Sequence, residues 1–297
     1  MVLGMMKEYD FIFSLGASCA ATQTLRDCGL QFTSLPLDWA ASPGIAFAAE
    51  MIVNGFPRWF ERGDLVLHDV RHEEGAVQRV YYNRYTHFGF PHEFTNAKPF
   101  EKCFDEVREK YFRRIARLDK LLSAKPRALG VYLEVATRRA QPLDALLKVR
   151  SDIVAKYPGL KLDLIYIHEL PGKRIPEIET ETDGVTIVAA DYAKFLNGVP
   201  MHTVDRTELV RFFHENFTVA GHDIAAEKAA YEREQKKMRK SHWGKGVIEK
   251  WINRKLFKTY RRLQDYLIAQ RLLPGDRPCW FEESDKAWPY WEKKIEN

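Results

Sequence analysis

Short apolar runs alternate with a helical repeat in the middle of the chain, and this pattern constrains the fold more than any other feature. Residues 129–135, 162–168 and 185–189 form short apolar runs that predict buried strands. Between the first two runs, apolar side chains recur at helical spacing over residues 143–155. Strands that alternate with helices predict a largely parallel sheet with right-handed crossovers. We therefore expect a three-layer α/β fold with a Rossmann-like sheet.

The pattern changes in the last third of the chain. Strand signals stop near Thr207, and helical spacing continues up to Leu273. Residues 227–271 hold 14 Lys and Arg against 5 Asp and Glu, although the net charge of the whole chain is only +5. The remainder is therefore mildly acidic. We expect an α/β body over residues 1–205 and a basic, mainly helical extension over residues 206–297.

Composition narrows the class of protein and its compartment. The 297 residues are 45% hydrophobic and 29% charged, which is typical of a globular protein large enough to bury a core without disulfides. The four cysteines form no CxxC pair and no zinc spacing, and no run approaches the roughly 20 apolar residues of a membrane span. The first residues lack the features of a signal peptide. We expect a cytoplasmic protein with reduced thiols and with neither a metal nor a cofactor.

A strand, a glycine loop and a helix follow one another near the N-terminus. The apolar run from Tyr9 to Leu15 predicts a buried strand, and Gly16 allows the tight turn that follows it. Ser18 is suited to cap a helix that begins at Cys19, and Gly29 stands where a helix-ending glycine is common. Cys19 is therefore expected in the first turn of a helix that leaves the carboxyl end of a strand, where open α/β sheets bind ligands.

This position gives Cys19 the chemistry of a candidate nucleophile. The backbone amides of Gly16, Ala17 and Ser18, with those at the start of the helix, are expected to form an anion-binding or oxyanion site. The same electric field favours a thiolate at Cys19. The alternative is a cysteine that only packs in the core, and it is about equally well supported because most cysteines are small buried side chains.

A thiol nucleophile needs a base, and two histidines lie in a stretch that is expected to reach the surface. We expect His92 to be the base, with His87 as the alternative, and Asp38 to orient the imidazole as the third residue of a triad. Each of these residues also has a structural interpretation. Either histidine is compatible with an ordinary surface or core position, and Asp38 is compatible with a turn before Trp39.

Three motifs give the chain a family resemblance. The first segment joins SLG-x-x-C to LR-x-x-GL and S-x-P-x-DW. The second is H-E-F, with Glu in the middle place where the family has Asp or His, and the third is K-Y-x-R-R-I-x-R. The residues that match are Ser14, Leu15, Gly16, Cys19, Leu25, Arg26, Gly29, Leu30, Ser34, Pro36, Asp38, Trp39, His92, Glu93, Phe94, Lys110, Tyr111, Arg113, Arg114, Ile115 and Arg117. Over about residues 8–205 the chain resembles the bacterial family described as putative papain-like cysteine peptidases (DUF1796).

The resemblance implies a Cys–His hydrolase or acyl-transfer enzyme with Cys19 as the nucleophile and His92 as the base. Its substrate would be a small molecule, a peptide or a saccharide. The chain departs from the family pattern after the strand that precedes the mid-chain helix. There Leu133 and Glu134 stand where the family usually has an arginine.

Two other classes of function stay open. A Rossmann-like sheet with an anion-binding first loop also suits a glycosyltransferase-like nucleotide-sugar enzyme of bacterial surface-polysaccharide assembly, with Asp38 or Glu93 as the general base. Neither a GxGxxG nor a DxD motif is present, so the signal for a nucleotide or a metal is weak. The third class is a non-catalytic protein that binds polyanions or a membrane surface.

Basic residues gather in two places. Arg113, Arg114 and Arg117 lie on the polar face of a helix that apolar spacing predicts over residues 100–122. A second group consists of Lys236, Lys237, Arg239 and Lys240, within the segment 228–271 where aromatic side chains alternate with Lys and Arg. Such a segment is able to bring a protein to the inner, anionic face of a membrane, but most charge-rich helices are only solvated helices packed on the body, and that interpretation is favoured here. No specific nucleic acid is expected as a partner.

Overall fold

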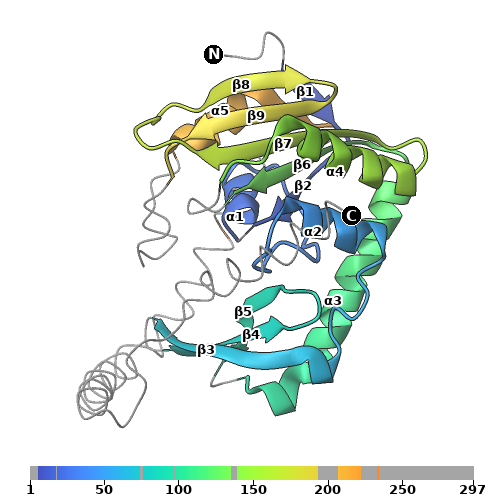
Figure 1. Ribbon diagram of the computed structural model, residues 1–297, viewed down its shortest axis with the longest axis vertical. Coiled ribbons are helices and arrows are strands. Elements are labelled where there is room, and N and C mark those ends of the chain that lie inside the picture. The colour runs from blue at the N-terminus through green and yellow to red at the C-terminus, as the bar shows by residue number, and fades with distance from the viewer. Residues whose placement is uncertain are drawn as a thin grey trace. The chain divides into compact units, whose positions relative to one another are not determined.

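The computed structural model describes most of the first three quarters of the chain. The described residues are 6–17, 19–73, 76–95, 98–134, 139–192, 207–221 and 233. They fall into two compact units, whose elements are labelled in Figure 1. The first unit combines Met1–Glu61 with Asp105–Arg233, and the second combines Arg62–Phe104 with Glu234–Asn297.

A mixed five-stranded sheet forms the centre of the first unit. Its strands follow the order β2 (Phe11–Gly16), β6 (Arg127–Leu133), β7 (Lys161–Glu169), β9 (Val185–Ala190) and β8 (Glu177–Thr182). The first four run parallel to their neighbours, whereas β8 is antiparallel to β9. The expected α/β fold is confirmed. The expectation of a largely parallel, Rossmann-like sheet is confirmed only in part. Strand β8 is antiparallel, and the strand order does not reverse as it does in a doubly wound sheet.

Helices cover both faces of this sheet. On one face, α1 (Cys19–Asp27) and α5 (Thr207–Asn216) pack on alternate strand residues such as Val131 and Ile165. On the other face, α2 (Ile45–Val53) and α4 (Leu143–Lys156) pack against each other and against β2, β7 and β9. Each strand of a covered sheet buries both sets of alternating side chains, which explains the continuous apolar runs in the sequence.

Helix α1 ends as the sequence predicts. Gly29 has a φ of +68°, and its N–H donates to the Arg26 carbonyl at 3.0 Å. The Leu30 N–H donates to the Leu25 carbonyl at 2.9 Å. This pair of bonds is the Schellman arrangement, in which a residue without a Cβ adopts the left-handed conformation at little cost.

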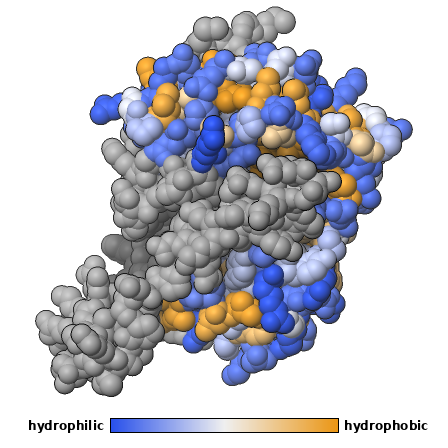
Figure 2. Space-filling view, in the orientation of Figure 1, coloured by the Kyte–Doolittle hydropathy of each residue, from blue (hydrophilic) through white to orange (hydrophobic). Residues whose placement is uncertain are grey.

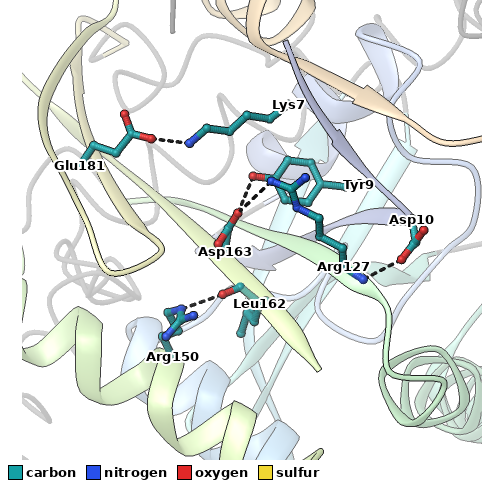
Figure 3. Close-up of polar contacts among 8 residues, drawn as sticks. All are labelled: Lys7, Tyr9, Asp10, Arg127, Arg150, Leu162, Asp163 and Glu181. Atoms are coloured by element: carbon teal, nitrogen blue, oxygen red, sulfur yellow. Dashed lines mark hydrogen bonds and ion pairs between the residues drawn. The ribbon is translucent and has the colours of Figure 1, made fainter. Parts of the chain in front are cut away.

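Two short strands at the sheet's amino end were not predicted. The three-residue strands β1 (Lys7–Tyr9) and β10 (Phe217–Val219) pair in parallel although they are far apart in sequence. The Tyr9 hydroxyl donates to an Asp163 carboxylate oxygen at 2.8 Å, and the Arg127 guanidinium lies over the Tyr9 ring at 4.9 Å (Figure 3). The buried Tyr9 thereby ties β1 to the first residues of β6 and β7.

The first unit continues past the boundary that the sequence predicts near residue 205. Helix α5 and strand β10 both lie beyond it, and both contribute to the core that α1 shares with the sheet. Most residues of the predicted basic extension lie outside the described part of the chain, so its separation as a segment of its own stays a prediction.

An antiparallel sheet forms the second unit. It consists of β3 (Leu65–Glu73), β4 (Ala76–Asn83) and β5 (Gly89–Thr95), preceded by the short helix η1 (Arg62–Asp64). The first turn of α3 (Phe100–Ser123) packs on this sheet through the stacked rings of Phe100 and Tyr81, which are 4.4 Å apart. The rest of α3 belongs to the first unit. Aromatic residues of β4 and β5, such as Tyr81, Phe90 and Phe94, contribute to this core.

The surface seen in Figure 2 is mainly hydrophilic, with apolar groups scattered among the polar ones. Exposed large apolar side chains include Val66 and Leu67 on β3 and Ile175 between β7 and β8. None of the helices in the described ranges combines the length and the apolar character that crossing a membrane requires.

Candidate functional site

The loop between β2 and α1 is shaped around a glycine. Gly16 has a φ of +104°, a region that side chains other than hydrogen rarely adopt. A Cβ at Gly16 would also lie 3.3 Å from the Cβ of Ser42, whose N–H donates to the Ala17 carbonyl at 2.8 Å. The loop therefore turns sharply at Gly16 and is anchored by the segment that leads into α2.

Cys19 is the first residue of α1, as predicted, and its side chain is partly exposed. The other two described cysteines, Cys28 and Cys103, are buried at 0% and 6% exposure. Cys28 packs between α1 and α5 in the core of the first unit, which agrees with the structural interpretation of that residue. Of the three, Cys19 is the one that a dissolved substrate can reach most readily.

Two of the amides that were predicted to bind an anion already have acceptors. The Gly16 N–H donates to the Ser14 hydroxyl at 3.1 Å, and the Ala17 N–H donates to the Leu133 carbonyl at 3.3 Å. Ser18 lies outside the described residues. The bond from Ala17 extends the pairing between β2 and β6, so the loop stays attached to the sheet for one residue beyond the strand.

The same bond places a buried carboxylate next to the loop. Glu134 follows Leu133 directly, and its side chain is 2% exposed. The Tyr166 hydroxyl donates to Oε2 of Glu134 at 3.1 Å and accepts the Gln141 N–H at 3.0 Å. From the sequence, Glu134 stands out only as a departure from the family pattern. Glu134 directly follows a predicted strand, and α/β sheets bind ligands at the carboxyl ends of their strands. This position could have identified Glu134 as a candidate site residue from the sequence.

Glu134 also affects a neighbouring tyrosine. The Tyr192 hydroxyl donates to the backbone carbonyls of Glu134 and Ile167 at 2.9 and 3.2 Å. Burial raises the pKa of Tyr192, and the nearby carboxylate of Glu134 raises it further. The carboxyl ends of β6, β7 and β9 thus meet in a compact polar cluster of Glu134, Tyr166 and Tyr192.

Asp38 is fully buried and is held by donors from its own unit. Its Oδ1 accepts the Thr22 hydroxyl at 3.2 Å, and its Oδ2 accepts the Gln31 side-chain amide at 2.8 Å and the Leu35 N–H at 2.7 Å. Burial raises the pKa of the Asp38 carboxyl, and these hydrogen bonds oppose the shift. The contacts connect α1 to the loop over residues 31–38, which is a structural role.

The two candidate bases lie in the second unit, whereas Cys19 lies in the first. His92 is an exposed residue of β5, in the stretch where the pairing with β4 is irregular between Arg79 and Tyr81. Such irregularities are frequent next to active sites. His87 lies in the β4–β5 turn with a φ of +61°, and its Nδ1 is 2.5 Å from the Tyr82 hydroxyl. Burial lowers the pKa of His87.

One histidine at the carboxyl edge of the first unit was not considered from the sequence. His168, near the end of β7, bonds through Nε2 to a carboxylate oxygen of Glu179 on β8 at 2.7 Å. No group of three or more His, Cys, Asp or Glu side chains suited to a metal ion occurs within the described ranges.

Comparison with known protein families shows which family the chain belongs to. The profile of the family described as "Putative papain-like cysteine peptidase (DUF1796)" matches residues 10–169, more than half of the sequence. This chain belongs to the DUF1796 family. The match covers the Cys19 loop, Asp38, both candidate histidines and Glu134, and it ends before the basic segment.

One curated relative of this DUF1796 protein has a viral source. The chain is 30% identical over 134 residues to "Uncharacterized protein R408" of Acanthamoeba polyphaga mimivirus. The match covers 40% of the chain and 59% of the relative, so the chain spans less than two thirds of that protein. A viral relative gives no support to a bacterial source. No solved structure matches the chain.

Membership of the family supports a cysteine hydrolase as the general kind of enzyme, but it assigns no catalytic residue.

The basic residues Arg113, Arg114 and Arg117 lie on α3, and Arg113 pairs with Glu109 one turn earlier at 3.7 Å. The predicted basic residues Lys236, Lys237, Arg239 and Lys240, and the membrane-binding role of segment 228–271, lie outside the described residues.

Proposed function

We propose that this DUF1796 protein is a cysteine-dependent hydrolase or acyl-transfer enzyme in which Cys19 is the nucleophile and His92 the base. The observation that carries the proposal is the position of Cys19. It is a partly exposed thiol that opens a helix at the carboxyl edge of parallel strands, in a chain whose family is described as cysteine peptidases. A helix start favours the thiolate, which is the reactive form.

The proposed reaction has two steps. His92 accepts the thiol proton, and the Cys19 sulfur adds to the substrate carbonyl carbon. The bond from that carbon to the leaving nitrogen or oxygen then breaks, and the leaving group takes the proton from the imidazolium. Water, or another acceptor, attacks the resulting thioester and restores the thiol. Amides at the start of α1 would stabilise the oxyanion.

The amides of Gly16 and Ala17 are less suited to this task than the sequence suggests, since both already donate hydrogen bonds within the fold. The proposed oxyanion donors are therefore the amides of the loop and helix start that follow them. The role of Asp38 in orienting the histidine stays a prediction. Its partners Thr22, Gln31 and Leu35 support a structural role in the first unit.

Iodoacetamide labelling across a pH series tests the nucleophile without a known substrate. The full-length protein is treated between pH 5 and 9, and the alkylation rate of each cysteine is followed by peptide mass spectrometry. We expect Cys19 to react fastest, with a midpoint below the usual thiol pKa of about 8.5. A midpoint at or above 8.5 would reject an activated thiol.

The histidine partner is tested in the same assay. Because an imidazolium stabilises a nearby thiolate, His92→Ala is expected to raise the Cys19 midpoint, while His87→Ala leaves it unchanged. The reverse result would assign the base to His87, and no effect of either change would reject both. Once a substrate is found, Cys19→Ser should abolish turnover and leave the circular dichroism spectrum unchanged.

A further inference from the structure

Two arginines from different helices hold the same serine in the first unit. Arg26 of α1 donates through Nη2 to the Ser34 hydroxyl at 2.8 Å. Arg117 of α3 donates through Nη1 to the Ser34 backbone carbonyl at 2.7 Å. The two guanidinium groups therefore flank one residue of the loop between α1 and α2, and their positive charges lie close together.

A third arginine adds to this charge. Arg114 of α3 and Arg26 both lie near enough to Asp38 for their positive charges to lower its pKa, against the larger effect of burial. Asp38 already accepts hydrogen bonds from Thr22, Gln31 and Leu35. Within the described ranges, neither Arg26 nor Arg117 forms an ion pair with a carboxylate. Arg26 and Arg114 thus face one buried acid, and Arg117 brings a third positive charge to Ser34 beside Arg26.

The guanidinium groups are held in place by aromatic rings. Arg26 lies over the Trp39 ring at 5.0 Å, and Arg114 lies over the Tyr111 ring at 4.9 Å. The Nε of Arg26 is buried and donates to no acceptor in the described structure. A buried charged donor without an acceptor is costly, and it is commonly satisfied by a bound ion or a water molecule. Arg117 is exposed, so the cluster is open to solvent.

We infer that Arg26, Arg114 and Arg117 form a binding site for the phosphate group of a small phosphorylated compound. Guanidinium groups present planar pairs of N–H donors that match tetrahedral oxyanions, and a cluster of three favours a dianion over a monoanion. Their pre-orientation by Trp39, Tyr111 and Ser34 reduces the entropy lost on binding. This inference does not depend on any reaction at Cys19.

Thermal unfolding of the full-length protein tests the site. The melting temperature is measured in inorganic phosphate and in sodium chloride of equal ionic strength. At phosphate about tenfold above its dissociation constant, we expect a rise of about 3 °C for the unchanged protein. Arg117→Gln should remove most of this rise. Arg113→Gln is the matched control, because Arg113 is exposed on the same helix and pairs with Glu109, and it should keep the full rise.

A direct measurement separates binding from stability. Broadening of the ³¹P resonance of inorganic phosphate is recorded with the unchanged protein, with Arg117→Gln and with Arg26→Lys, which keeps the charge but loses the paired donors. We expect broadening that both changes weaken, and competition by methyl phosphate would show that a phosphate ester enters the same site. Absence of broadening, or an equal loss in Arg113→Gln and Arg117→Gln, would overturn the inference and leave only a non-specific basic surface.

Discussion

The Tyr166 hydroxyl donates a 3.1 Å hydrogen bond to the carboxylate of Glu134, at the sheet edge from which the Cys19 loop leaves. This bond holds a buried carboxyl group one residue beyond the point where Ala17 bonds to Leu133. Neighbouring strands lie about 4.8 Å apart. The Glu134 carboxylate is therefore expected to influence any thiolate in the adjacent loop.

Glu134→Gln should lower the pH midpoint of Cys19 alkylation by iodoacetamide. A carboxylate that is not fully screened opposes a nearby thiolate, so its removal should lower the thiol pKa by about half a unit to one unit. Glu179→Gln serves as the control, since Glu179 lies on β8 at the far edge of the sheet. A midpoint that is the same in Glu134→Gln and the unchanged protein would show that the two groups do not interact.

Replacing Asp38 by alanine should destabilise the first unit by about 2–4 kcal/mol, because three donors would lose their buried acceptor. Asp38→Asn should cost much less, since its amide oxygen can accept from Gln31 and Leu35 while its NH₂ group faces the Thr22 hydroxyl. Urea denaturation measures both values. Asp152→Ala is the control, because Asp152 is an exposed partner of Lys148 and should change stability by at most about 0.5 kcal/mol.

The raised pKa of Asp38 also predicts how the stability of the protein changes with pH. Because the folded state binds the proton more tightly than the unfolded chain does, this group favours folding most at pH values below its unfolded pKa of about 3.9. The contribution is lost as the pH rises through the higher, folded-state pKa. The stability of the unchanged protein relative to Asp38→Asn should therefore fall from pH 4 upward. A difference that rises with pH over this range would contradict the assignment.

Tyr9→Phe should destabilise the protein by about 1 kcal/mol, which is the typical net value of one hydrogen bond, here to Asp163. Burial raises the pKa of Tyr9, and the hydrogen bond to Asp163 raises it further. The folded state thus retains this proton above pH 10, where the unfolded chain loses it, so the residue's contribution declines as the pH rises further. Denaturation between pH 9 and 11 should show less alkaline loss in Tyr9→Phe than in the unchanged protein.

The imidazole of His87 should titrate below its usual pKa of about 6.5, because burial disfavours the charged form. The folded state then binds fewer protons than the unfolded chain, so stability is lost as the pH falls through 6.5. Tyr82→Phe removes the hydroxyl that lies 2.5 Å from Nδ1 but leaves the imidazole desolvated, so the pKa should stay below 6.5. NMR titration of the ring protons measures both values, and a midpoint above 6.5 would be inconsistent with a buried ring.

Local patterns in the sequence determined most of the separate elements. Helices α3 and α4 were predicted within one residue of their observed bounds, and Cys19 was predicted as the opening residue of α1. These elements carry their own periodicity and end signals, such as Gly29, which needs the left-handed conformation after α1. The motifs of the first 170 residues likewise led to the DUF1796 family.

Tertiary structure alone decided which elements meet. Strands β1 and β10 are each three residues long, and they pair although they are far apart in the sequence of the first unit. Strands this short contain no repeat from which they could be predicted. Three other features also depend on residues that are distant in sequence. They are the antiparallel pairing of β8, the bond from Ala17 that brings Glu134 beside the Cys19 loop, and the contacts of two arginines with Ser34. Side-chain periodicity reports which face of an element is buried, but the identity of the partner follows from packing and hydrogen bonding between segments that no local window contains.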